Sequence, residues 1–167
     1  NLKGENNQLI LIGKTFGHLE QSCFYKENFS INSGMPPEIN LSNEKNNGEG
    51  LLKLIDKNLV LSSHDVSNGG LITALSEMAL NSNFGAKIQK PKKLSNLIKY
   101  FFGEDQARYI IEVDKDNLFK IEKILKDNEI YYENIGVTQR DYFEIEGELK
   151  ISTKDLFKIN NEWYNNY

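Results

Sequence analysis

The stretch "LVLSSHDVSNGGLITALSEMALNS" (residues 59–82) changes character twice and decides the fold. Its first five residues, "LVLSS", are mostly apolar and predict a strand. The polar "HDVSN" ends that strand, and Gly69 and Gly70 lead into "LITALSEMALNS", whose apolar residues recur at helical spacing. A strand joined to a helix by so short a turn predicts packed layers of sheet and helix.

The same kind of alternation continues on both sides of this stretch. Further strands are expected at "NQLILIG", "GAKIQ", "ARYIIEV", "YYENIGVTQ" and "YFEIEGELKIS", the last folded back at Glu146-Gly147. The sequence therefore predicts one α/β (α+β) domain, residues 1–167, in which a mixed sheet is layered with helices. Helices are expected within residues 17–28, over 41–58 with an apolar stripe at Glu44, Leu51, Leu52, Leu54 and Ile55, over 70–82 and 116–128, and in the tail 153–167.

Composition excludes several classes of protein. The net charge of -4 and the pI near 5.3 argue against a nucleic-acid partner, which requires clustered Lys and Arg. Cys23 is the single cysteine, so an intrachain disulfide and a multi-thiolate zinc site are excluded, and the cytoplasm is the expected location. No apolar run approaches the length of a membrane span. The polar start "NLKGENN" without Met suggests a piece of a longer chain.

The turn between strand and helix is a candidate anion site. The first N–H groups of a helix lack intrahelical partners, and they attract phosphate where glycines leave the backbone uncovered. Phosphate or nucleotide binding is therefore predicted at Ser67, Gly69, Gly70 and Leu71. The alternative is that these residues only make a tight connection. We expect an anion here rather than at the solvated side chains of Lys90, Lys92 and Lys93.

The two histidines, His18 and His64, are candidates for catalytic or metal-binding residues. His64 and Asp65 suggest a base oriented by a carboxylate, but neighbouring strand residues point to opposite faces. His64 is therefore expected to be structural or to line the cleft beside the substrate. His18 is expected to be a surface residue without a partner. Neither has the neighbours that a metal site needs, so no metal ligand and no catalytic residue is assigned.

A second polar cluster precedes the strand "ARYIIEV". Glu104, Asp105 and Gln106 lie at a strand end, where α/β folds often gather ligand groups. They are candidate cleft residues together with His64 and Asp65. A solvated turn is the alternative, because acidic residues beside strands are common.

These segments together resemble one family. "LILIGKTFGHLEQSCFY", "GMPPEINL", "SSHDVSNGGLITALSEMAL", "FGAKI" and "FFGEDQARYIIEV" are similar, in this order, to the C-terminal module of the synthetase subunit of phosphoribosylformylglycinamidine synthases. The resemblance spans nearly the whole chain, and its most specific part is "HDVSNGGL" followed at the expected distance by "GEDQAR". Asn68 stands where the family commonly has Asp, which makes a metal role for that position doubtful.

The resemblance implies a function for the parent enzyme. Such enzymes use ATP and Mg²⁺, bound mainly by modules absent here, to convert formylglycinamide ribonucleotide and glutamine-derived ammonia into the amidine. Implied partners are the remaining modules of the parent chain, a glutaminase subunit, a small bridging subunit and a phosphorylated ribonucleotide. The isolated piece is expected to be inactive. Two alternatives stay open: a structural module with a vestigial cleft, or part of a sibling enzyme such as aminoimidazole ribonucleotide synthetase, selenophosphate synthetase or thiamine-monophosphate kinase.

Overall fold

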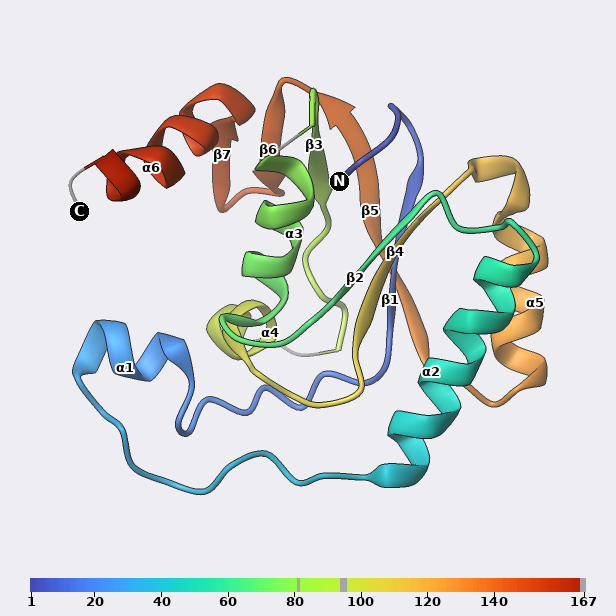
Figure 1. Cartoon of the computed structure of the whole chain (residues 1–167), viewed down its shortest axis with the longest axis horizontal. Helices are drawn as coiled ribbons and strands as arrows, with labels where there is room; N and C mark the ends of the chain where they lie inside the picture. Colours follow the sequence, from blue (N-terminus) through green and yellow to red (C-terminus); the bar gives the residue numbers. More distant parts are fainter. Residues whose placement is uncertain (81, 94–95, 166–167) are drawn as a thin grey trace.

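The computed structural model describes residues 1–80, 82–93 and 96–165. These residues form a seven-stranded sheet with helices on both faces (Figure 1). The strands are β1 (Gln8–Ile12), β2 (Ser62–Asp65), β3 (Phe84–Ile88), β4 (Tyr109–Val113), β5 (Tyr132–Arg140), β6 (Tyr142–Ile145) and β7 (Leu149–Ser152). The helices are α1 (Cys23–Phe29), α2 (Leu41–Asp56), α3 (Gly70–Leu80), α4 (Leu97–Phe102), the short 3-10 turn η1 (Lys115–Asn117), α5 (Leu118–Asp127) and α6 (Thr153–Asn165).

The strand order is β2-β4-β1-β5-β3-β6-β7, and within the described residues only β3 and β6 pair in parallel. The predicted mixed sheet layered with helices is therefore confirmed. β5 and β6 follow each other in the chain but flank β3, so the chain crosses the start of β3. A Cβ atom on Gly85 would lie 1.9 Å from the carbonyl oxygen of Tyr142, which explains why glycine stands at the crossing.

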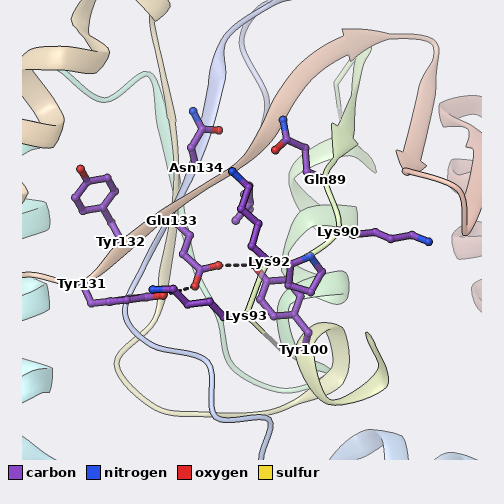
Figure 2. Close-up of a pocket in the computed structure, with 11 residues that line it drawn as sticks. Gln89, Lys90, Lys92, Lys93, Tyr100, Tyr131, Tyr132, Glu133 and Asn134 are labelled. Carbon is purple, nitrogen blue, oxygen red and sulfur yellow. Dashed lines mark hydrogen bonds between the residues drawn. The ribbon is translucent and has the colours of Figure 1, made fainter. Parts of the chain in front are cut away.

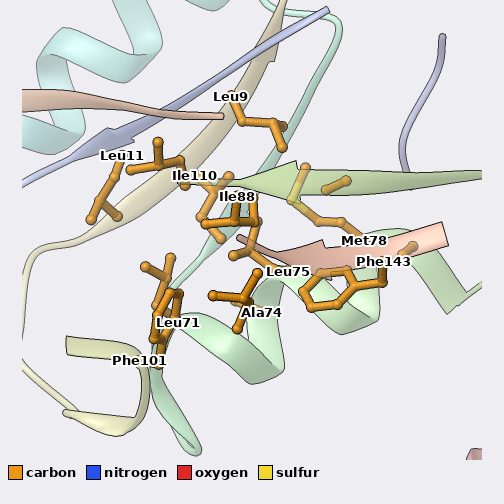
Figure 3. Packing of buried hydrophobic residues seen from close by; sticks show 14 of the residues in the cluster. Leu9, Leu11, Leu71, Ala74, Leu75, Met78, Ile88, Phe101, Ile110 and Phe143 are labelled. Atoms are coloured by element: carbon orange, nitrogen blue, oxygen red, sulfur yellow. The ribbon is translucent and has the colours of Figure 1, made fainter. Parts of the chain in front are cut away.

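Alternation along β1 divides the core into two layers. Leu9 and Leu11 face α3 and α4, whereas Ile10 and Ile12 face α2 and α5. Figure 3 shows the first layer, in which Leu71, Leu75 and other residues of α3 pack against the sheet. All of these side chains are buried, so the strongly apolar α3 is held by the sheet beneath it.

Besides α4 (Leu97–Phe102), for which no helix was expected, the expected elements and the observed ones differ in two places. The strand predicted at residues 59–63 is observed at Ser62–Asp65, because Leu59 packs between the helices and the sheet instead. Strand β2 lies at the edge of the sheet and pairs only with β4 among the described strands, so its outward residues are polar.

The apolar stripe predicted for the helix of residues 41–58 is the second difference. Asn47, Gly50 and Leu54 form the buried side of α2, while Leu52 and Ile55 are exposed. The helix is rotated so that Gly50 lies against Ile130, and a Cβ at Gly50 would be 2.1 Å from the Ile130 side chain. The close approach decided the orientation, and the sequence pattern alone did not carry that information.

Candidate functional site

Asp105 is the centre of a buried polar network at the loop before β4. It is 4% exposed, and its carboxylate accepts hydrogen bonds from three consecutive backbone N–H groups. Phe16 and Gly17 donate to Oδ2 at 3.0 and 2.9 Å, and His18 donates to Oδ1 at 3.2 Å. A carboxylate held by several N–H groups fixes the loop that follows β1. Asp105 therefore organises backbone that lies far away in the sequence.

Arg108, which the sequence analysis did not single out, fills the space behind this carboxylate. Its guanidinium is almost fully buried and donates to the carbonyl oxygens of Asp105 and Gly103 at 3.2 and 2.5 Å, and to Thr15 Oγ1 at 3.2 Å. Burial lowers the pKa of Arg108, and the nearby Asp105 carboxylate opposes that shift. The sequence signal that could have identified Arg108 is its place at the end of the polar segment "GEDQAR", directly before a buried strand.

Glu104 connects this loop to the turn before α3. Its Oε1 accepts hydrogen bonds from the N–H groups of Gly69 and Cys23, both at 2.8 Å. The two candidate segments of the sequence are thus brought together by a direct contact. Burial, followed by the neighbouring Glu104 charge, raises the pKa of the Cys23 thiol.

The turn at residues 67–70 has backbone that only glycine adopts at low cost. Gly69 and Gly70 have φ angles of +79° and +73°. A Cβ at Gly70 would lie 2.7 to 2.8 Å from backbone atoms of Phe101, Phe102 and Gly103. The Gly70 N–H donates to the Ser67 carbonyl at 3.1 Å, and the Gly69 N–H is taken by Glu104. A phosphate at this turn would have to displace Glu104 or use the N–H groups after Gly70, such as that of Leu71.

His64 is oriented by groups other than the Asp65 carboxylate. Its Nδ1 lies 2.6 Å from the Asp65 carbonyl oxygen but 3.7 Å from the nearest Asp65 carboxylate oxygen, too far for a hydrogen bond. Its Nε2 lies 3.2 Å from Glu77 Oε2 on α3. As expected, the side chains of His64 and Asp65 do not form a hydrogen bond with each other. The sequence analysis missed Glu77, although a carboxylate one helix away was visible in "ALSEMAL".

A separate cavity of about 310 Å³ is lined by two of the five predicted cleft residues. Asp105 and Gln106 line it, with Gln106 exposed. His18 also lines it, and its Nε2 lies 2.8 Å from the Met35 carbonyl oxygen, so His18 does have a partner, contrary to expectation, although this contact is exposed. Glu104 is not among the residues that line this cavity. The candidate residues therefore divide between the turn before α3 and this separate cavity.

The described residues do not fit a bound metal ion. No group of three or more His, Cys, Asp and Glu side chains in that part of the chain is placed to hold one. The carboxylates of Glu104 and Asp105 already accept backbone N–H groups, which leaves them poorly suited to Mg²⁺. Among the same residues, no helix combines the length and apolar character needed to cross a membrane.

The comparison with known proteins extends over nearly the whole chain. This chain is 48% identical over 166 residues to the phosphoribosylformylglycinamidine synthase subunit PurL of Pelagibacter ubique. The aligned region covers 99% of this chain and 23% of that protein. The chain thus spans less than a quarter of the length of the curated relatives it matches.

Solved structures share the fold at much lower identity. Thermotoga maritima PurL complexed with FGAR superposes with a TM-score of 0.73 at 15% identity, covering 93% of this chain and 28% of that chain. The complex of the same protein with ATP superposes with a TM-score of 0.70 at 14% identity, and the superposition covers 93% of this chain and 26% of that chain. The profile of the AIR synthase related protein, C-terminal domain, matches residues 4–146. The resemblance read from the sequence is confirmed, and the chain belongs to the family of AIR synthase related protein C-terminal domains.

Proposed function

We propose that residues 1–167 are the C-terminal module of a phosphoribosylformylglycinamidine synthase. The parent enzyme, an ATP-dependent ligase of purine biosynthesis, would convert formylglycinamide ribonucleotide and ammonia into formylglycinamidine ribonucleotide. The observation that carries this proposal is the 48% identity to the Pelagibacter ubique subunit across 99% of the chain. Fold likeness alone would not distinguish one member of a fold family from another.

The module would act by positioning backbone rather than by reacting. Three loops at one end of the sheet are held in place by Asp105, Glu104 and Arg108. Such a rigid end of the sheet is suited to pack against the remaining modules of the parent chain. ATP and Mg²⁺ would be held by those other modules, since the groups described here are engaged with one another. The proposal includes a glutaminase subunit, a small bridging subunit and a cytoplasmic location.

A second candidate is a purely structural module whose phosphate cleft is vestigial. The hydrogen bond from the Gly69 N–H to Glu104 favours it, because the group that a phosphate would need already has a carboxylate partner. Titration of the chain with ATP, ADP and formylglycinamide ribonucleotide separates the two. Saturable binding that Ser67→Ala weakens supports the phosphate role of Ser67, Gly69, Gly70 and Leu71. No saturable binding supports the structural module.

An exchange experiment tests the proposed function. The matching segment of the Pelagibacter ubique enzyme is replaced by this chain, and amidine formation is measured with ammonia as the nitrogen donor, so that no glutaminase is needed. We expect an active chimera and no activity from the isolated chain. A soluble, folded chimera without activity would contradict the proposal and favour a sibling enzyme of the same fold. Product formed by the isolated chain would contradict its expected inactivity.

A further inference from the structure

Two adjoining cavities lie beside the start of β5, away from the turn before α3. One has a volume of about 240 Å³ and the other about 340 Å³. Figure 2 shows the first, walled by the segment after β3, by α4 and by β5. Both cavities are lined by Pro91, Lys93, Tyr100, Tyr131 and Glu133.

The Glu133 carboxylate is fixed in this space by two tyrosines. Tyr100 donates its hydroxyl to Oε2 at 3.0 Å, and Tyr131 donates to Oε1. Each carboxylate oxygen has two lone pairs, so each retains one acceptor position after its tyrosine is bound. Glu133 thus offers two neighbouring acceptors in a fixed orientation, which suits the two hydroxyls of a vicinal diol.

Three lysines supply positive charge at the same place. The ammonium groups of Lys93 and Lys14 lie 5.3 and 5.7 Å from the ring centroid of Tyr131, within the range of a cation–π contact. Lys92 lines the smaller cavity. None of the three forms an ion pair with a carboxylate of the described residues, whereas Lys90 pairs with Glu148 and points away in Figure 2. The three lysines line one or both of the two cavities, where Glu133 is the one lining carboxylate among the described residues, and this excess of positive charge suits a dianion.

From this arrangement we propose that the pocket binds a small phosphate monoester that carries a vicinal diol, the chemistry of a sugar phosphate. The lysines contact the phosphate and Glu133 accepts from the two hydroxyls. Ligand sites usually span about 300 to 1,000 Å³. Both cavities lie near or below the lower limit of that range, so the occupant is smaller than a nucleotide.

This site differs from the anion site expected at residues 67–71, and it does not depend on the proposed function. The sequence analysis treated the lysines of "KPKK" as solvated charges. The fold instead brings Tyr131, 38 positions later by residue number, beside Lys93 and orders the ammonium group at a cavity wall. An ordered cation binds phosphate better than a mobile one, because less side-chain entropy is lost on binding.

Isothermal titration of the 167-residue chain with ribose 5-phosphate tests the site. Inorganic phosphate and 2-deoxyribose 5-phosphate serve as probes that lack the diol. We expect saturable binding of ribose 5-phosphate, and weaker binding of both comparison probes. Lys93→Gln and Lys92→Gln should each lower the affinity for ribose 5-phosphate by about tenfold, because each removes one charge-assisted contact with the phosphate. Lys90 also lines the smaller cavity, but its ammonium group is paired with Glu148, so Lys90→Gln is the matched control on the same segment and should weaken binding much less.

Glu133→Gln tests the diol contact separately. It should reduce the affinity for ribose 5-phosphate to that for 2-deoxyribose 5-phosphate, and it should not weaken the binding of inorganic phosphate, because a negative charge is removed from the pocket. Absence of saturable binding overturns the proposal. So does equal affinity for ribose 5-phosphate and inorganic phosphate in the unsubstituted chain, a comparison that remains valid even where Glu133→Gln does not fold. Equal losses in Lys93→Gln and Lys90→Gln would also overturn it, because they would indicate diffuse attraction.

Discussion

The Gly69 N–H donates to Glu104 Oε1 at 2.8 Å across 35 positions of sequence. The same oxygen accepts the N–H of Cys23, the first residue of α1. One carboxylate oxygen therefore joins the turn before α3, the start of α1 and the loop before β4. The segment that looked like an open cradle in the sequence is closed by an acidic side chain of the same chain.

Removal of this carboxylate should loosen all three segments. We expect Glu104→Ala to lower the free energy of unfolding by about 2 kcal/mol, since hydrogen bonds to a charged group are lost on the protein side. Glu104→Gln keeps an acceptor oxygen and should lose less. Urea unfolding of both variants measures the difference.

The same variant tests the phosphate cradle. Glu104→Ala frees the Gly69 N–H and removes a negative charge, so a genuine phosphate site at residues 67–71 should bind inorganic phosphate more tightly in Glu104→Ala than in the unsubstituted chain. Unchanged, non-saturable binding by nuclear magnetic resonance titration would show that the turn serves only the connection between β2 and α3.

Gly70→Ala should be strongly destabilising. A positive φ is unfavourable for alanine, and the added Cβ meets backbone atoms at the C-terminal end of α4 and of Gly103 at 2.7 to 2.8 Å. We expect a loss of more than about 2 kcal/mol in unfolding free energy. Gly48→Ala is the matched control. Gly48 lies within α2, where a Cβ would meet only the Tyr109 hydroxyl at 3.7 Å, so this change should stabilise by about 0.4 to 1 kcal/mol. Equal effects of the two changes would contradict the argument.

Glu112 should prove essential for the position of the N-terminal segment. Its buried carboxylate accepts the backbone N–H groups of Lys3 and Gly4, the Asn7 amide and the Ser62 hydroxyl. Glu112→Ala leaves these donors without their acceptor and should cost about 3 kcal/mol or more. Hydrogen exchange at Lys3 and Gly4 should accelerate as well. Glu122→Ala, in an exposed pair with Lys126, should leave both measurements nearly unchanged.

The tyrosines that bind Glu133 predict a loss of stability at alkaline pH. Burial, together with the hydrogen bond and charge of Glu133, raises the pKa of Tyr131 to about 12 and raises that of Tyr100 as well. A raised folded-state pKa contributes stability that is full below the ordinary tyrosine value of about 10 and is lost as the pH rises above it. We expect the unfolding free energy to fall between pH 10 and about 12.

Substitution isolates that contribution from the other groups that titrate in the same range. Tyr100→Phe removes one of the two phenols, so the fall in unfolding free energy over this interval should be smaller than in the unsubstituted chain. Tyr25→Phe, at a tyrosine that does not contact Glu133, is the control and should leave the slope as it is. Identical slopes in all three proteins, measured by urea unfolding at each pH, would refute the assignment.

Periodicity located most elements, because the apolar pattern and the packing agree in them. The helix begun by Gly70 and the strand centred on Ile111 are found where the pattern placed them. Strand β2 was displaced because an edge strand with polar outward residues has little apolar pattern. The stripe of α2 was predicted in part: Leu54 is buried and Leu51 packs against the core, but Leu52 and Ile55 are exposed. The exact rotation of the helix depends on the close approach of Gly50 to Ile130, two residues 80 positions apart.

The candidate residues were recognised more readily than their roles. Ser67, Gly69, Glu104 and Asp105 were singled out, yet the contacts that define Glu104 and Asp105 link residues between 35 and 89 positions apart. No local pattern encodes such contacts. Glu112 was overlooked, although a charged residue inside the apolar "YIIEV" was a usable signal, since a buried carboxylate requires partners.

The order of the strands also determines when the sheet can form during synthesis. Among the described strands, β1 pairs with β4 and β5, β2 pairs with β4, and β3 pairs with β5 and β6. A ribosome must therefore reach β4, which starts at Tyr109, before any of them finds a partner. Until then the apolar residues of β1 are available to other chains, a condition that favours aggregation and chaperone binding. Strands β1 and β2 therefore remain without a partner strand while the residues between them and β4 are being made.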